Sequence, residues 1–222
     1  MANGFFKLIF KSNLLYIGER IKKGTFKPSI SPIAIKYKQK HREEGILPLP
    51  YSTVTGSIQA LLGDDKNVHA IGKITRYKKG YMAVAPYDSA LNTAKLPITI
   101  EYLADVQGEF YIKKTDDFNS LDLIGKDFHL GGLKSKGFGN CEILSRHMFE
   151  PKRTNGKGRF LSRIYYEDDV LRHFGIDKEN IIKPYFGYLF KKTSIFDGYY
   201  QKSIFENTIV RNGYDFLMEV IK

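Results

Sequence analysis

A glycine-rich stretch, GGLKSKGFG at residues 131–139, restricts the possible folds of this chain more than any other feature. Four of its nine residues are glycine and two are lysine. Glycine allows positive φ and a close approach of the backbone to a ligand, and successive N–H groups in such a loop can converge on an anion. The alternative is an ordinary turn between two elements. The candidate anion-binding residues are Gly131, Gly132, Lys134, Ser135, Lys136, Gly137 and Gly139.

The residues before this loop predict one strand, one helix and two hairpins. Apolar residues alternate with lysines at 6–10, which is typical of a strand. A helical spacing of apolar residues follows at 52–63. Residues 68–85 and 97–113 each resemble a β-hairpin, with turns at 78–80 and at Gly108.

A short helix that begins at Thr115, the glycine-rich loop and a strand from Cys141 to Phe149 complete the first unit. The resulting β-α-β-β-α-β order predicts an α+β fold with a ferredoxin-like domain, similar to an RNA-recognition motif, over residues 1–150. Both the P-loop and the dinucleotide motif lie after a strand and before a helix. The glycine-rich loop is expected in the reverse order and matches neither motif, so we expect no nucleotide cofactor.

The predicted helix at 52–63 begins with hydroxyl-bearing residues. Ser52 or Thr53 can cap its first turn, and Thr55 adds a third hydroxyl. Gly56 in that turn costs about 1 kcal/mol relative to alanine. We therefore expect a close neighbour at Gly56, either protein backbone or a ligand.

The formal net charge of +11 indicates an acidic partner, either nucleic acid or an anionic membrane. Residues 20–42 hold eight Lys or Arg and no acidic residue. We predict that this segment, about residues 20–45, is a basic insertion that contacts nucleic acid, and a solvated loop is the alternative. No amphipathic helix lies beside the basic runs, which disfavours a membrane. The candidate contacts are Lys36, Lys38, Lys40 and Arg42.

The chemistry-bearing residues give little support for catalysis. A single cysteine, Cys141, leaves no internal disulfide and no multi-cysteine zinc site, and we expect it to be buried as a small apolar residue. The five histidines are dispersed without metal-ligand spacing. His129, beside the glycine-rich loop, could act as a general base in RNA cleavage. The absence of a long apolar run predicts a cytoplasmic protein.

Residues 151–222 are predicted to form a β-rich subdomain that packs on the first unit. A second basic run extends from Lys152 to Arg163 and could contact target DNA. A short helix is expected at 168–174, and a hairpin is expected from strands at 184–193 and 198–205. A final strand is expected at 218–221.

Aromatic residues in the basic and glycine-rich segments are candidates for stacking on unpaired bases. The three residues in this position are Tyr37, Tyr51 and Phe138. Most of the other phenylalanines and tyrosines are expected in the core or on strand faces.

Two of these stretches together resemble the RAMP superfamily of CRISPR-associated proteins. Residues 47–56, LPLPYSTVTG, look like its proline-rich lead-in and helix start, and residues 131–139 look like its signature glycine-rich loop. The form of the first stretch is most similar to the group-five subunit, which caps the 5′ handle of the crRNA in Cascade-like effectors. The type I-D version is nearest, with a type III equivalent next. Two other members are alternatives: the backbone subunit and a metal-independent endoribonuclease that cleaves repeat RNA.

The resemblance implies a non-catalytic, cofactor-free RNA-binding subunit in a ribonucleoprotein complex for antiviral defence. The glycine-rich loop would hold the backbone of the 5′ handle. The insertion at about 20–45 would form a thumb that crosses the guide and touches the backbone subunit. The start of the helix at Ser52 would offer N–H groups and hydroxyls to phosphate. The expected partners are crRNA, the backbone subunit, the large subunit and target DNA, with no membrane.

Overall fold

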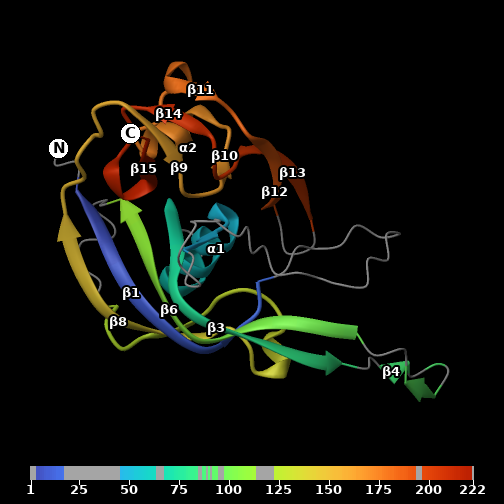
Figure 1. Ribbon diagram of the computed structural model, residues 1–222. Helices are drawn as coiled ribbons and strands as arrows, with labels where there is room; N and C mark the ends of the chain where they lie inside the picture. Colours follow the sequence, from blue (N-terminus) through green and yellow to red (C-terminus); the bar gives the residue numbers. More distant parts are fainter. Residues whose placement is uncertain are drawn as a thin grey trace.

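Figure 1 shows a computed structural model of the chain, which describes residues 4–17, 46–63, 68–84, 87–88, 90, 92–94, 98–113, 123–193 and 197–221. The predicted basic insertion at about 20–45 lies outside the described residues. Most of the short helix predicted from Thr115 also lies outside them. Its last two residues, Leu123 and Ile124, are described and are not helical.

A six-stranded antiparallel sheet, in the order β2-β3-β6-β1-β8-β7, forms the larger part of the described structure. The predicted strands at 6–10 and from Cys141 to Phe149 are confirmed as β1 and β8, which pair with each other. Phe5 and Phe6 of β1 are both buried, so both faces of this central strand are covered. The strands are β1 (Phe5–Leu15), β2 (Leu47–Leu49), β3 (Ala70–Val84), β6 (Ile98–Lys113), β7 (Asp127–His129) and β8 (Asn140–Phe149).

The two predicted hairpins are wrong, because each is one continuous strand. Strands β3 and β6 pair with each other from Ala70↔Ile112 to Val84↔Ile98. The glycines that suggested turns lie opposite aromatic rings instead. A Cβ on Gly80 would lie 2.4 Å from the Tyr102 ring, and one on Gly108 would lie 2.4 Å from the Phe10 ring. Glycine therefore makes room for a ring here, which is the other common reason for glycine inside a strand.

The far ends of β3 and β6 project from the body as a two-stranded arm (Figure 1). The arm leads to the short pair β4 (Tyr87–Asp88) and β5 (Thr93–Ala94). Lys78 and Asp105 form an exposed ion pair on it, with 2.6 Å between Nζ and Oδ2.

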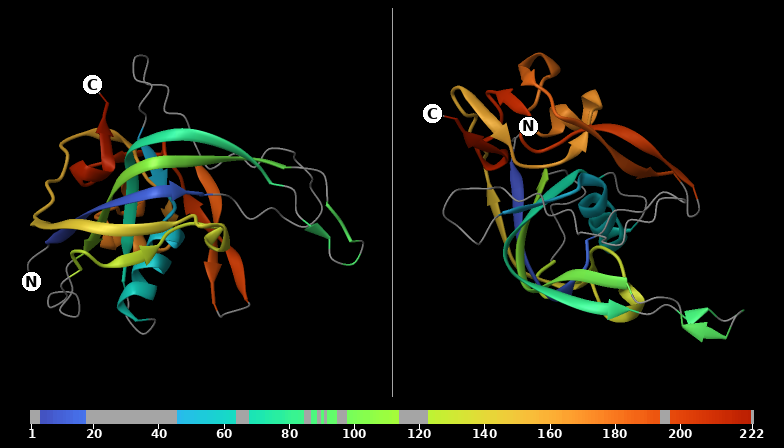
Figure 2. Two further views of the ribbon diagram at one scale, coloured as in Figure 1. Left: turned by 90° about the horizontal axis from the view of Figure 1, so that it is seen from below. Right: turned by 45° about the vertical axis from the view of Figure 1, so that its right-hand side comes forward.

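Helix α1 (Tyr51–Leu62) confirms the predicted helix and lies within the curve of the sheet (Figure 2). Val54 and Ile58 are fully buried in the core beneath the sheet. The predicted side-chain cap is wrong: Pro50 occupies the N-cap position, and no side chain caps the helix. Instead, the N–H of Tyr51 donates to the carbonyl of Arg163 at 2.9 Å. Gly63 ends the helix with a positive φ.

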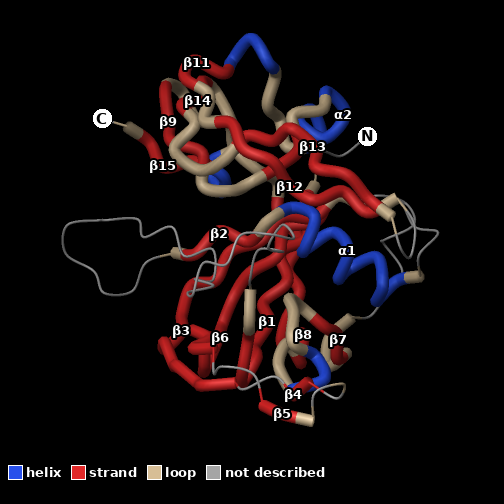
Figure 3. The backbone as a smooth tube through the Cα atoms, turned by 90° about the vertical axis from the view of Figure 1, so that its right-hand side faces the viewer, coloured by secondary structure: helices blue, strands red, loops and turns tan. Residues whose placement is uncertain are grey.

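The C-terminal part contains helix α2 and two small sheets, and it covers one end of the main sheet (Figure 3). The predicted helix, hairpin and final strand are confirmed as α2, β12–β13 and β15. The sheets have the strand orders β10-β13-β12 and β11-β14-β9-β15. The elements are β9 (Lys157–Phe160), β10 (Ile164–Tyr165), α2 (Asp168–His173), β11 (Ile181–Lys183), β12 (Phe186–Lys192), β13 (Gly198–Ile204), β14 (Ile209–Arg211) and β15 (Met218–Val220).

The two parts share an apolar core. Phe5, Ile71 and Tyr111 from the main sheet are buried in one cluster with Phe160 and Phe174 from the C-terminal part. Phe5 contacts the rings of Phe174, Tyr214 and Phe216 at centroid distances of 5.2–6.3 Å. Burial of this area is a large favourable term in folding, so the C-terminal part is fixed on the main sheet.

The described residues therefore form a mixed α+β structure, which confirms the predicted class. It is mostly antiparallel sheet, with two α-helices in the described part of the chain. No helix among the described residues is both long enough and apolar enough to cross a membrane.

Candidate functional site

The glycine-rich loop connects β7 to β8, which pair antiparallel from Asp127↔Glu142 to His129↔Asn140. A strand, not a helix, therefore comes directly before the loop, which corrects the predicted order. A strand also follows it, so the loop still lacks the helix that a P-loop requires.

Glycine is needed in this loop because the backbone lies against the end of β1. The N–H of Gly132 donates to the Tyr16 carbonyl at 2.9 Å, and the N–H of Gly139 donates to the Leu14 carbonyl at 2.8 Å. Gly131 has φ +79°, and a Cβ there would lie 2.2 Å from the Tyr16 oxygen. These glycines therefore serve the fold directly.

The loop's N–H groups are mostly used within the protein, which corrects the picture of a cradle of converging N–H groups. Residues 134–136 form a short 3₁₀ turn. The N–H groups of Lys136 and Phe138 donate to the Leu133 carbonyl, and that of Gly137 donates to the Lys134 carbonyl. Lys134, Ser135 and Lys136 are exposed. An anion would therefore be held chiefly by these side chains.

Phe138 cannot stack on a base, because its side chain is only 3% exposed. It packs in a small apolar cluster with Tyr16 and Ile100. Its ring packs edge-to-face with the ring of Tyr102, with 5.5 Å between the two centroids. Cys141, two residues after the loop, is buried as predicted. Burial raises the pKa of its thiol to about 11.

Two of the predicted contacts at the start of α1 are also buried. The Thr55 hydroxyl donates to the carbonyl of Ala70 at 3.1 Å and accepts from its N–H at 3.2 Å. Tyr51 is 4% exposed, and its hydroxyl is 2.7 Å from Nδ1 of His69. Neither residue can reach RNA. Ser52 and Thr53 are partly exposed, so they keep this possibility.

The exposed side of α1 and the glycine-rich loop line one cleft of about 570 Å³. Two stretches that lie about 80 residues apart in the sequence thus meet at one site. An added Cβ on Gly56 would have no atom within 4 Å, so the expected protein neighbour is absent and the backbone here is open to the cleft. The lining residues are Ile17, Thr53, Gly56, Ser57, Ala60, Leu61, Asp127, Phe128, His129, Gly131, Gly132 and Lys134.

The chemistry of this cleft suits a phosphodiester backbone. Lys134 supplies a cation, and Thr53 and Ser57 supply hydroxyls. The Ser57 hydroxyl donates a hydrogen bond to the Thr53 carbonyl at 2.9 Å, and its oxygen can still accept a hydrogen bond from a ligand. Among the described residues, no group of three or more His, Cys, Asp or Glu side chains is arranged to hold a metal ion.

A second cleft, of about 510 Å³, lies between the main sheet and α2, and no motif in the sequence indicates it. His69 and His173 stack there with ring centroids 3.8 Å apart, although they lie 104 positions apart in the chain. Burial, followed by the nearby charges of His173 and Lys113, lowers the pKa of His69 to about 4. His69 is therefore neutral near pH 7.

One residue of the predicted second basic run from Lys152 to Arg163, Arg163 itself, is too deeply buried to contact nucleic acid. Arg163 is 2% exposed and forms a buried double hydrogen bond with Glu206, at 2.7 and 2.9 Å. Arg153 donates to the carbonyls of Gly175 and Asn212. Both arginines hold the C-terminal part together. The predicted contacts Lys36, Lys38, Lys40 and Arg42, and Tyr37 between them, lie outside the described residues.

A chain of known structure shares this fold. A chain from the cryo-EM structure of the type III-B Cmr-beta bound to cognate target RNA aligns with a TM-score of 0.53 and 12% sequence identity, over 92% of this chain and 86% of that chain. A chain from the type III-B Cmr-beta bound to cognate target RNA and AMPPnP aligns with a TM-score of 0.46 and 13% identity, over 92% and 85% of the two chains. No protein-family model and no curated protein matches the sequence.

Proposed function

We propose that this protein is a non-catalytic, crRNA-binding subunit of a CRISPR effector complex, and that the cleft between α1 and the glycine-rich loop holds the 5′ handle of the guide. One observation carries the proposal. The two stretches that resemble the RAMP superfamily, residues 47–56 and 131–139, contribute to the same cleft. A distant similarity in fold to a chain from an RNA-bound assembly agrees with it.

The strand order supports placing the first part among ferredoxin-like RAMP domains. The four long strands lie in the order β8-β1-β6-β3, which is fourth, first, third and second along the chain. Helix α1 lies between the first and second of them in sequence. This is the arrangement expected of a β-α-β-β-α-β unit. We propose a ferredoxin-like unit at residues 1–150 with a β-rich subdomain at 151–222.

The basic insertion at about 20–45 would then act as the thumb that crosses the guide and touches the adjacent backbone subunit. Its eight basic residues and lack of acidic residues over 20–42 suit a polyanion. In this role the protein would occur once per guide, whereas the backbone subunit would occur several times. Native mass spectrometry of the purified complex separates these alternatives by stoichiometry.

Substitution of the exposed loop lysines tests the proposal. We expect Lys134→Ala/Lys136→Ala to weaken binding to repeat-derived RNA and incorporation into the effector complex. A matched control is Lys152→Ala/Lys157→Ala, which removes the same charge from exposed positions in the C-terminal part. If the loop variant binds RNA and assembles as well as the control, the cleft does not hold the handle.

The second candidate function is a metal-independent endoribonuclease, because His129 lines the cleft together with Lys134. A histidine in this place could take the proton of a 2′-hydroxyl. Incubation of the protein with repeat RNA in EDTA separates the two functions. Site-specific cleavage that His129→Ala abolishes would favour the nuclease, and intact RNA would favour the binding subunit.

A further inference from the structure

The hairpin formed by β12 and β13 places several aromatic residues on one face. Side chains alternate along a strand, and directly paired residues point to the same side of the sheet. The pairs Tyr188↔Lys202 and Phe190↔Tyr200, with Phe186 two residues before Tyr188, therefore share a face. We call these five residues the aromatic face.

The aromatic face is open, in contrast to the buried aromatic core next to it. Tyr188 is 66% exposed, Phe186 is 46% exposed and Tyr200 is 43% exposed. Successive rings on β12 are two residues apart, or about 7 Å along the strand. That spacing leaves room for separate planar groups to lie against separate rings.

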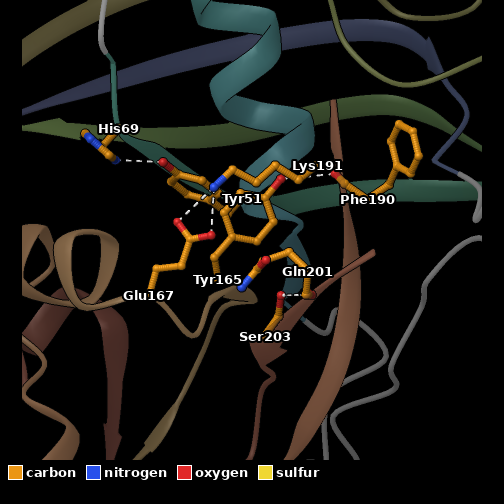
Figure 4. Close-up of polar contacts among 8 residues, drawn as sticks. All are labelled: Tyr51, His69, Tyr165, Glu167, Phe190, Lys191, Gln201 and Ser203. Atoms are coloured by element: carbon orange, nitrogen blue, oxygen red, sulfur yellow. Dashed lines mark hydrogen bonds and ion pairs between the residues drawn. The ribbon is translucent and has the colours of Figure 1, made fainter. Parts of the chain in front are cut away.

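The opposite side of the hairpin is anchored, so the exposure of the aromatic face reflects a fixed structure. Leu189 is buried, and the carbonyl of Phe190 accepts a hydrogen bond from the Tyr165 hydroxyl at 3.0 Å. Lys191 forms an ion pair with Glu167, with 2.7 Å between Nζ and Oε1. Figure 4 shows these contacts joining the hairpin to Tyr165 of β10 and to Glu167, just before α2.

The net charge of the hairpin is positive. Residues 183–204 contain four lysines and one acidic residue, Asp197 in the turn. Nζ of Lys202 lies 3.9 Å from the centroid of the Phe186 ring and 5.3 Å from that of Tyr166. Such cation–π contacts hold the ammonium group among the rings. A partner of this surface must therefore offer planar apolar groups together with negative charge.

We propose that the aromatic face binds single-stranded RNA, with unpaired bases stacked on Tyr188 and Tyr200 and with phosphates near Lys202 and Lys192. A single-stranded nucleic acid combines planar bases with one negative charge per nucleotide. Bases stack on aromatic rings with little sequence preference. This site is separate from the cleft at the glycine-rich loop, and the proposal does not depend on the function assigned to that cleft.

The test measures binding of the full chain to an unstructured oligouridylate of about 20 nucleotides. Each base–ring stack contributes roughly a 5- to 150-fold change in affinity. We therefore expect Tyr188→Ala/Tyr200→Ala to weaken binding at least about 10-fold. The matched control, Tyr188→Phe/Tyr200→Phe, keeps both rings and should bind as the wild type does. An abasic oligonucleotide of equal length, which has no bases to stack, should bind the wild type and both double variants with equal affinity.

The Tyr188→Ala/Tyr200→Ala substitutions are also made in the Lys134→Ala/Lys136→Ala variant. This second measurement tests the aromatic face independently of the proposed role of the cleft. Loss of the rings should weaken binding in both backgrounds, whether or not the loop lysines matter. Equal affinity of the ring-deleted variant and the wild type would overturn the proposal. So would a variant that binds the oligonucleotide normally but no longer associates with a protein subunit, because the face would then be a protein interface.

Discussion

The cleft beside the glycine-rich loop and the aromatic face of β12–β13 differ in almost every property that matters for RNA binding. The cleft is a hollow whose lining includes glycine backbone, hydroxyls and Lys134, beside apolar side chains and Asp127. The aromatic face is open and carries rings, with Lys202 among them. The first suits phosphates, which carry no sequence information, and the second suits the faces of unpaired bases.

The RNA-binding chemistry of this basic protein is therefore not spread evenly over its surface. Charge attracts the polyanion everywhere, but only particular local geometries decide which part of a nucleotide is held. The two surfaces lie on different parts of one body, and the shared core fixes their separation. A single strand could therefore contact both only along a defined path.

The largest expected effect comes from the ion pair between Arg163 and Glu206, which is buried within the C-terminal part. Glu206→Ala leaves the Arg163 guanidinium buried without its carboxylate, and breaking such a pair typically costs about 3–5 kcal/mol. We expect a loss of this size in the free energy of unfolding, measured by chemical denaturation.

Lys78→Ala, on the exposed arm, is the control for this loss, and its denaturation midpoint should stay unchanged. If Glu206→Ala is as stable as this control, the buried pair does not stabilise the C-terminal part.

The next effect concerns the cleft side alone and compares two glycines of the loop. Both Gly131 and Gly137 have φ close to +80°, but only at Gly131 would a Cβ meet a backbone oxygen, at 2.2 Å. Gly131→Ala should cost about 1–3 kcal/mol in unfolding free energy, and Gly137→Ala should cost less. Equal midpoints in thermal denaturation would show that the loop does not need its close contact with Tyr16.

Salt dependence sharpens the comparison between charge and stacking. Each neutralised phosphate of a single strand changes the slope of log K against log salt by about 0.7. Lys134→Ala/Lys136→Ala should therefore reduce the slope by about 1.4, whereas Tyr188→Ala/Tyr200→Ala should lower affinity at every salt concentration without changing the slope. Titrations with oligouridylate at several salt concentrations measure both. A changed slope in the ring-deleted variant would contradict the division of roles.

The smallest expected effect is a pH dependence at the contact between the main sheet and α2. The pKa of His69 is about 4 in the folded protein and about 6.5 when unfolded. Between these values the unfolded chain binds more protons, so stability falls as the pH drops from about 6.5 towards 4. The denaturation midpoint of the wild type should decrease more between pH 7.5 and 5 than that of His69→Gln. Equal decreases in the two midpoints would show that His69 does not cause the pH dependence of stability.

Much of the fold was predictable because its signals are local. The alternation at Phe6, Leu8 and Phe10 and the spacing of Val54 and Ile58 follow directly from strand and helix periods. The wrong predictions of hairpins arose because glycine occurs both in turns and beneath aromatic rings within strands. Gly80 and Gly108 signalled turns, but each lies beneath an aromatic ring from a neighbouring strand, and no local pattern reveals that contact.

The candidate site shows the same limit. The sequence identified both stretches that line the cleft, but it could not show which side chains face it. Tyr51, Thr55 and Phe138 were reasonable candidates by type, and all three are buried by tertiary packing. The stacked pair of His69 and His173 and the aromatic face both depend on long-range pairing, which the spacing of residues along the chain does not show.

The central claim is that RNA lies in the cleft between α1 and the glycine-rich loop. Photocrosslinking of the assembled complex, with 4-thiouridine placed in the 5′ handle of the guide, tests it most directly. We expect crosslinked peptides that contain residues 53–57 or 131–136. Crosslinks confined to other described segments of this chain, or found only on other subunits, would contradict it.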